Sequence, residues 1–291
     1  MTAHDNELTI LSMRRGQPSL GFSPVYEFED QVARLMSAQV FEPDFRPDWQ
    51  RSVLRGPLRD RISPMTLAKQ PSGGKTLLVV VPTPAYLAGL NAVKDWRQKF
   101  DTVAALIIDS YQVRDYRLPK SMYGLDHIFT PILEDVELVE KMTGVPTSIL
   151  PFGADALVEG SMRGSSDRPI DMIGFGRQPK DYDLPIREAF NEPGSGRFYL
   201  YSTIHSPTPI SRTDERSVFW KTLRRANLSL AFCTLKYYHR KIPVSIVTPR
   251  WFESLNAGCV VIGKRPDTPL ADQLLDWPDA TIDVPDDPGD L

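Results

Sequence analysis

The chain has 291 residues, of which 41% are hydrophobic and 24% charged, which is the composition of an ordinary globular protein. Its length favours two domains. A net charge of −3 gives no electrostatic reason to expect bulk binding to nucleic acid or to a membrane surface. The two cysteines and four scattered histidines lack the spacing of a zinc site, so we expect no bound metal.

The sequence shows no targeting or membrane-spanning segment. Residues 1–8 lack the basic and then apolar pattern of a signal peptide. The longest aliphatic run, 77–81, is too short to cross a bilayer. We therefore expect a cytoplasmic protein whose membrane contact, if it has one, is peripheral. Cys233 and Cys259 lie within or beside apolar runs, which favours buried free thiols, with a disulfide as the alternative.

Short aliphatic strands alternate with helical segments along the first half of the chain. The loop after the first strand contains glycine and proline, and region 42–74 has no assignable element. The predicted strands cover 8–12, 38–41, 77–81, 103–108, 127–129 and 148–150, and the predicted helices cover 26–37, 84–100 and 132–142.

A second series of strands and helices follows a Gly- and Ser-rich linker. Continuous apolar strands joined by helices are typical of a parallel sheet that is covered on both faces. The predicted strands are 170–174, 198–202, 228–232, 259–262 and 280–284, and the predicted helices are 183–190, 214–225, 250–257 and 270–275.

The predicted fold class is therefore α/β, with two Rossmann-like doubly wound domains that face one another across a cleft. The N-terminal domain covers 1–155, the linker 156–168 and the C-terminal domain 169–291. Ligands bind beyond the carboxyl ends of the strands in such sheets. Because the last strand is normally followed by a further helix or two, we expect the sequence to be a fragment or a short version of the fold.

The segment 248–263, T-P-R-W-F-E-S-L-N-A-G-C-V-V-I-G, has clear helix boundaries. Thr248 suits the N-cap, where its hydroxyl would accept a hydrogen bond from an amide of the first turn. Pro249 suits the first helical position, and Gly258 suits the residue that ends the helix. We expect an apolar strand directly after this helix.

The amino end of this predicted helix is a candidate anion site, because its amides and the Arg250 side chain both favour negative charge. Glu253, one turn further in, could accept hydrogen bonds from two hydroxyls of a sugar ring. A binding site for an anion next to a binding site for a diol suits a nucleotide diphosphate with its ribose. The alternative is a surface ion pair between Arg250 and Glu253, worth ~0.2–0.5 kcal/mol.

Two further candidates lie at predicted strand ends. In 174–180, G-F-G-R-Q-P-K, two glycines would let a ligand approach the backbone, and Arg177 and Lys180 could bind phosphate oxygens. The alternative is a plain strand-to-helix turn with solvated cations. Asp109 follows the strand 103–108, at a position where catalytic carboxylates often lie. The alternative to a catalytic role is that Asp109 only caps a helix or forms a turn.

Three motifs together resemble GT-B-fold glycosyltransferases of the group-1-like and spore-maturation-type branch. L-P-F-G-A-D at 150–155 is similar to the turn at that family's domain junction, and I-G-F-G-R at 173–177 to the opening strand of its donor domain. Segment 248–263 resembles its nucleotide-sugar helix. The resemblance spans most of 76–291, and residues 1–75 fit only in the order of elements.

The resemblance implies a metal-independent glycosyltransferase that takes a UDP- or GDP-linked sugar, without another cofactor, and transfers it to an unknown acceptor. The first domain would hold the acceptor, with its loop 14–23 shaping specificity. Glu253 would bind the ribose, and the amides from Arg250 onward would bind the diphosphate. The cations after the 170–174 strand would neutralise the leaving pyrophosphate. The expected catalytic residues are Asp109 and Arg177, and the expected nucleotide-sugar ligands are Arg177, Lys180, Thr248, Arg250, Glu253 and Ser254.

The chain departs from the family at two places. Retaining members carry two glutamates seven residues apart, and Ser245 stands at the earlier position here. Arg177 and Lys180 are separated by two residues rather than four. The resemblance therefore assigns neither retention nor inversion. Two alternatives remain: a catalytically inert binding module in polysaccharide or envelope assembly, and a nucleotide-binding epimerase, whose G-x-G-x-x-G the loop at Gly16 lacks.

Overall fold

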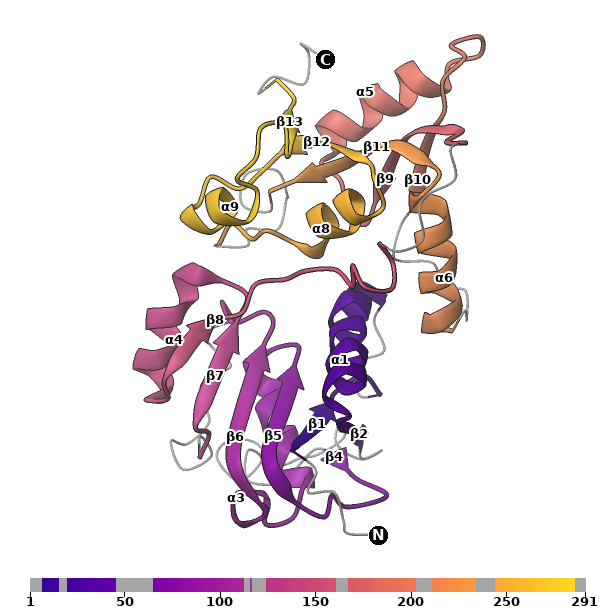
Figure 1. Cartoon of the computed structure of the whole chain (residues 1–291). Helices are drawn as coiled ribbons and strands as arrows, with labels where there is room; N and C mark the ends of the chain where they lie inside the picture. The colour runs from indigo at the N-terminus through magenta and orange to yellow at the C-terminus, as the bar shows by residue number, and fades with distance from the viewer. Residues whose placement is uncertain are drawn as a thin grey trace, which may run out of the picture. The chain divides into compact units, whose positions relative to one another are not determined.

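The computed structural model of the chain divides into two compact units, Met1–Pro151 and Phe152–Leu291 (Figure 1). It describes residues 7–15, 20–45, 65–112, 116, 124–160, 167–202, 211–233 and 244–285. Each unit is an α/β structure with its own parallel sheet, as the sequence predicts. Within the described ranges, no helix combines the length and the apolar character needed to cross a membrane.

The sheet of unit 1 has six parallel strands in the order β2-β1-β5-β6-β7-β8. The chain winds outward from β1 in one direction to β2 and in the other from β5 to β8, so the order reverses between β1 and β5. The strands are β1 Leu8–Ser12, β2 Gln39–Phe41, β5 Gly74–Val81, β6 Phe100–Ile107, β7 His127–Thr130 and β8 Thr147–Ile149.

Helices cover this sheet, and a short antiparallel pair lies outside it. Helix α1 packs beside β1 and α4 beside β8. The helices are η1 Leu20–Phe22, α1 Ser23–Met36, η3 Pro84–Ala92, α3 Trp96–Lys99, η6 Leu133–Asp135 and α4 Val136–Thr143, and the antiparallel pair is β3 Asp44–Phe45 with β4 Met65–Thr66.

The core of unit 1 follows from the register of its two central strands. Leu77 pairs with Val103, and Val81 pairs with Ile107, and all four side chains are fully buried. Aliphatic residues on neighbouring strands therefore stack in one layer, which is typical of a parallel sheet. The same register brings the carboxyl ends of β5 and β6 to one edge.

The predicted single helix over 84–100 is wrong. The structure has the 3-10 helix η3 and, after Asp95 in a left-handed conformation (φ 53°), the single turn α3. Most of η3 is buried, and a Cβ on Gly89 would lie 2.8 Å from a methionine methyl carbon. Packing on several sides, rather than one amphipathic stripe, therefore sets the conformation of this segment.

The sheet of unit 2 has five parallel strands in the order β10-β9-β11-β12-β13, so its order reverses between β9 and β11. The strands are β9 Ile170–Phe175, β10 Tyr199–Ser202, β11 Ala226–Phe232, β12 Val260–Lys264 and β13 Ile282–Asp283, and the helices are α5 Lys180–Asn191, α6 Arg212–Leu223, α8 Pro249–Asn256 and α9 Pro269–Leu274.

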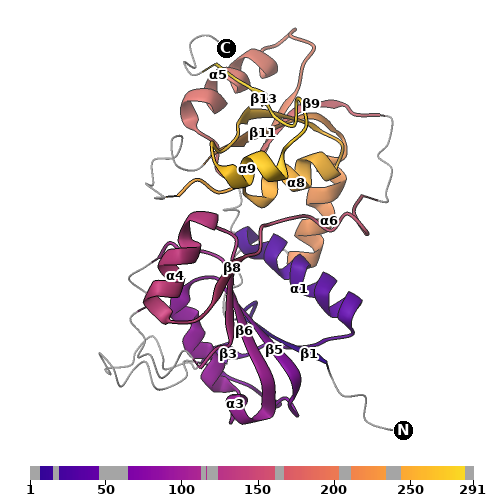
Figure 2. The same ribbon diagram turned by 60° about the vertical axis from the view of Figure 1, so that its left-hand side comes forward.

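Helices lie on both faces of the second sheet (Figure 2). On one face Tyr182 of α5 packs with Phe232 of β11. On the other, Trp251 of α8 packs with Ala231 of β11 and Ala271 of α9. Successive residues of β11 thus point to opposite faces, which is the alternation of a strand. This arrangement leaves the carboxyl edge of the sheet next to the amino ends of its helices.

Candidate functional site

The carboxyl edge of β9 and β11 is the place where a ligand is expected in unit 2, because the strand order reverses there. The amino end of α8 lies at this edge. The Arg250 guanidinium carbon is 5.6 Å from the centroid of the Phe175 ring, and Phe175 is the last residue of β9. The structure therefore brings Arg250 to the end of the strand that leads into Arg177.

The boundaries of α8 agree with the sequence, but the predicted cap hydrogen bond does not form. Thr248 has the extended N-cap conformation, with Pro249 next, but its side chain accepts no hydrogen bond from the helix. The Trp251 amide, which the hydroxyl could have bound, lies 3.3 Å from the Thr248 carbonyl oxygen. Thr248 Oγ1 is buried and has no hydrogen-bond partner in the part of the chain that the structure describes.

The end of α8 is as predicted. The chain turns at Gly258, whose φ of +77° is the left-handed conformation that glycine adopts most easily. Strand β12 begins two residues later. The sequence thus defines both ends of the helix that carries Arg250, Glu253 and Ser254.

Glu253 is held from another helix. Glu253 is only 3% exposed to solvent. The alternative of a surface ion pair between Arg250 and Glu253 is therefore wrong. Arg216 of α6 donates to Glu253 through Nη2, which is 2.5 Å from Oε1, and its own side chain is 11% exposed. Sequence reasoning missed Arg216 because the two residues are far apart in the chain and belong to no shared motif.

Ser254 faces the sheet. Its side chain is fully buried, and its Oγ lies 2.8 Å from the Oγ of Ser229 on β11. In this conformation the hydroxyl forms a polar contact between helix and sheet. A role for Ser254 in ligand binding stays a prediction that would need this contact to open.

The two predicted phosphate ligands of the β9–α5 connection are exposed. Arg177 lies in the loop, and Lys180 is the first residue of α5. Between them Gln178 bridges the two strands at the reversal point, since its Nε2 donates to the carbonyl oxygens of Phe175 (3.0 Å) and Leu230 (3.4 Å). Gln178 therefore stabilises the loop that carries Arg177 and leads to Lys180, a role that the motif G-F-G-R-Q did not reveal.

Gly174 allows close packing between neighbouring strands and does not leave space for a ligand to approach the backbone. A Cβ at this position would lie 2.1 Å from the hydroxyl oxygen of Tyr199 on β10. That hydroxyl donates to Asp183 of α5, and the buried carboxylate also binds Arg187 at 2.6 Å. Desolvation raises the pKa of Tyr199 well above its usual value, and the hydrogen bond to Asp183 adds to this. The prediction that Gly174 lets a ligand reach the backbone is therefore wrong.

Asp109 belongs to unit 1. It lies in the turn after β6, where its amide donates to the Pro82 carbonyl oxygen (2.9 Å) and its own carbonyl oxygen accepts from the Gln112 amide (3.2 Å). These bonds fit the turn-residue alternative. The predicted nucleotide-sugar ligands all lie in unit 2, so a catalytic role for Asp109 beside them stays a prediction.

A buried charged cluster at the carboxyl end of β1 was not predicted. Glu29 of α1 is fully buried and accepts from Ser12 Oγ (2.5 Å) and from Arg14 (2.6 Å). Arg14 also reaches Asp30 at 2.7 Å. Desolvation raises the pKa of Glu29 to about 7, although Arg14 and Ser12 act in the opposite direction.

This pKa predicts a pH-dependent stability of unit 1. Because Glu29 ionises near pH 4.5 in the unfolded chain but near 7 when folded, its contribution is complete below pH 4.5 and is lost as the pH rises to about 7. At about 1.4 kcal/mol per pKa unit, the loss is roughly 3 kcal/mol. Urea unfolding at several pH values should show that Glu29→Gln gains stability relative to the wild type across this window. Asp30→Asn, whose side chain is exposed, should not, and equal behaviour of the two variants would contradict the assignment.

The prediction of free cysteines is confirmed, and other residues named in the sequence lie outside the described part of the chain. Cys233 and Cys259 are buried and free, as predicted, and desolvation raises the pKa of Cys259 to about 11. His127, one of the four histidines, lies 3.0 Å from Ser148 Oγ through its Nε2. Two further histidines, His205 and His239, lie outside the described residues, as does Gly16. Among the described side chains, no group of three or more His, Cys, Asp or Glu could hold a metal ion.

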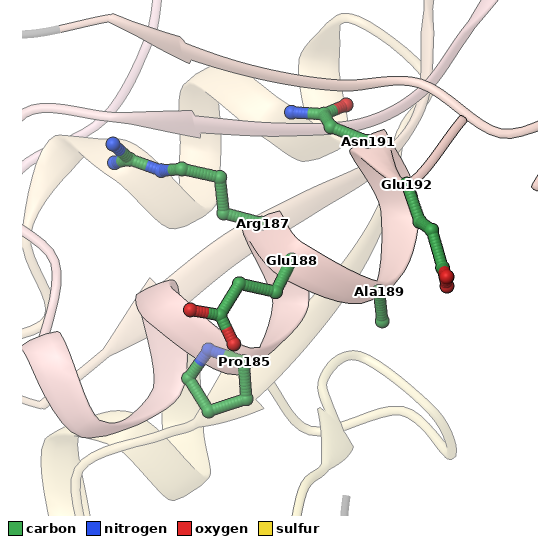
Figure 3. A pocket seen from close by; sticks show the side chains of 6 residues that line it. All are labelled: Pro185, Arg187, Glu188, Ala189, Asn191 and Glu192. Atoms are coloured by element: carbon green, nitrogen blue, oxygen red, sulfur yellow. The ribbon is translucent and has the colours of Figure 1, made fainter.

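A surface cavity of about 630 Å³ lies on the carboxyl-terminal half of α5 (Figure 3). The side chains drawn there all come from this one helix and its end, and none is a predicted ligand. The lining residues are Pro185, Arg187, Glu188, Ala189, Asn191 and Glu192. Because a helix carboxyl end points toward the amino edge of the strands in this fold, the cavity belongs to a different region from the candidate site.

The class that the fold defines is an α/β protein with two parallel-sheet units, each with a reversal in strand order. No protein-family model matches the chain, and no curated protein matches it. The residues at the carboxyl edge of unit 2 therefore provide the basis for a function.

Proposed function

We propose that the protein is a metal-independent glycosyltransferase of GT-B architecture, which uses a UDP- or GDP-linked sugar. Unit 2 would bind the donor at the carboxyl edge of β9 and β11. Unit 1 would bind an acceptor across the cleft of that architecture, with Asp109 as a candidate catalytic group. A cytoplasmic location and a place in polysaccharide biosynthesis belong to the same proposal.

The observation that carries this proposal is the approach of α8 to the end of β9. Arg250 lies over Phe175, and the exposed Arg177 follows two residues after that ring. A helix amino end and two cations therefore share one edge of the sheet. This combination suits a diphosphate, because amides and guanidinium groups both bind phosphate oxygens.

The chemistry requires such an arrangement. Negative charge grows on the diphosphate as the bond between the sugar carbon and the phosphate oxygen breaks. Cations and helix amides that are already in place stabilise this charge without having to reorganise. Arg177 and Lys180 would act on the leaving diphosphate, and the amides that follow Arg250 would hold it in position.

A second candidate is an inert binding module. Its support is that Glu253 and Ser254, two predicted ligands, are buried, and that Ser254 is bonded to Ser229 of the sheet. If no ligand reaches these two residues, α8 serves only the core of unit 2. The two candidates differ in whether a nucleoside diphosphate binds at all.

Calorimetric titration with UDP and with GDP separates the candidates. We expect micromolar binding of one of them, equally strong in EDTA and in magnesium. Arg250→Ala should weaken that binding by about ten- to hundredfold, which corresponds to ~1.5–3 kcal/mol for a charged hydrogen bond.

The matched control is Arg225→Ala. Arg225 precedes β11 at the opposite end of the sheet, and its side chain is 55% exposed. This variant should bind as the wild type does. Absence of binding to both nucleotides would overturn the proposed enzyme and favour the inert module, and equal losses in the two arginine variants would remove Arg250 from the site.

A further inference from the structure

We propose that Arg216 of α6 is a positioning residue, which holds the Glu253 carboxylate for the two hydroxyls of the donor ribose. This inference rests on the proposed function and adds a residue that no sequence motif marks. Its basis is the buried ion pair, in which Arg216 Nη2 lies 2.5 Å from Glu253 Oε1.

The geometry of Arg216 makes it a rigid partner. Its guanidinium carbon lies 4.2 Å from the centroid of the Phe219 ring and 5.5 Å from that of Trp220. A guanidinium packed on aromatic faces loses freedom and gains a cation–π attraction. Phe219 in turn packs edge-on against Phe175, at 4.9 Å between ring centroids.

These contacts form one continuous chain at the carboxyl edge of β9. Phe175 contacts both Arg250 and Phe219. Phe219 packs against Arg216, which binds Glu253. The cation expected to meet the diphosphate and the carboxylate expected to meet the ribose are therefore linked through aromatic rings. A nucleotide that bridges Arg250 and Glu253 would find both held in place before it binds.

The proposed role uses the acceptor capacity of the carboxylate. A carboxylate can accept about four hydrogen bonds, so one group can bind a guanidinium and a diol together. A buried carboxylate without a cation favours its neutral form, which accepts hydroxyl hydrogen bonds less well. Arg216 thus supplies both the orientation and the charge balance that a diol-binding carboxylate needs.

The test compares the better bound of UDP and GDP with its 2′,3′-dideoxy analogue, by calorimetry. In the wild type the ribonucleotide should bind at least about tenfold tighter, the ratio that 1.4 kcal/mol produces. Arg216→Gln should bring this ratio close to one while the affinity for the dideoxy analogue stays unchanged. Arg216→Lys, which keeps the charge, should restore part of the ratio, and Lys221→Gln on the exposed face of α6 should leave it unaltered.

A merely structural role for Arg216 gives a different result. A loosened unit 2 would weaken the binding of both nucleotides equally, so the ratio of their affinities would not change. An unchanged ratio in Arg216→Gln overturns the inference but leaves the proposed function standing. No wild-type binding to either nucleotide overturns both. If Arg216→Gln does not fold, Phe219→Leu tests the same point, since it frees the guanidinium and keeps the charge pair, and an unaltered ratio there overturns the inference.

Discussion

Trp251→Ala is expected to lower the free energy of unfolding of unit 2 by about 3–5 kcal/mol, the usual cost of removing a large buried aromatic side chain. Trp251 is fully buried between α8 and the sheet. Its indole Nε1 also donates to Thr281 Oγ1 at 3.0 Å, so the truncation removes packing and leaves that hydroxyl without its donor. Urea unfolding followed by circular dichroism measures the change.

The matched control is the tryptophan at position 277, which follows α9 and is 45% exposed. Trp277→Ala should change the free energy of unfolding by about 0.5 kcal/mol or less, as surface substitutions usually do. A loss at Trp251 no larger than that at Trp277 would show that α8 does not pack on the sheet as described.

Arg177→Ala is expected to slow donor hydrolysis and sugar transfer by about 100- to 1,000-fold, or ~2.7–4 kcal/mol in the barrier. The reason is that Arg177 is exposed at the end of β9, where it can meet the charge that develops on the leaving diphosphate. Under the proposed function the effect should fall mainly on kcat, since this charge is greatest in the transition state. Release of UDP or GDP from the donor sugar gives the rate.

Arg197→Ala provides the comparison for this variant. Arg197 is also exposed in unit 2, but its guanidinium lies 5.5 Å from the Phe190 ring, between α5 and β10. Its substitution should leave the rate unchanged. Equal rates in the Arg177 variant and the wild type would show that this arginine does not stabilise the leaving group.

Much of the fold could be predicted because it depends on local pattern. The aliphatic runs correspond to β5, β6 and β11, and the capping residues around α8 mark its ends to within a residue. Such signals act over a few residues, so the linear sequence contains them. The helix expected over 84–100 failed for the opposite reason, because its conformation depends on side chains that reach it from other elements.

The arrangement of the candidate site was predicted only in part. Arg250 and Arg177 lie at the same sheet edge, as the strand-end rule implies, whereas the partner of Glu253 was not foreseen. Arg216 belongs to a helix with no motif of its own, and only the tertiary structure brings it to the carboxylate. Gly174 looked like a ligand-binding glycine, but the hydroxyl of a neighbouring strand fills the space.

The sequence by itself determined the α/β class, the order of the strands along the chain and, to within a residue, the helix that presents Arg250, because periodicity, capping and strand length are local properties. Only the tertiary structure decided which strands are neighbours, which carboxylates are buried and which cation each of them meets. Those outcomes depend on contacts between residues distant in the chain, such as Arg216 with Glu253 and Arg14 with Glu29, where burial makes an unpaired charge too costly to keep.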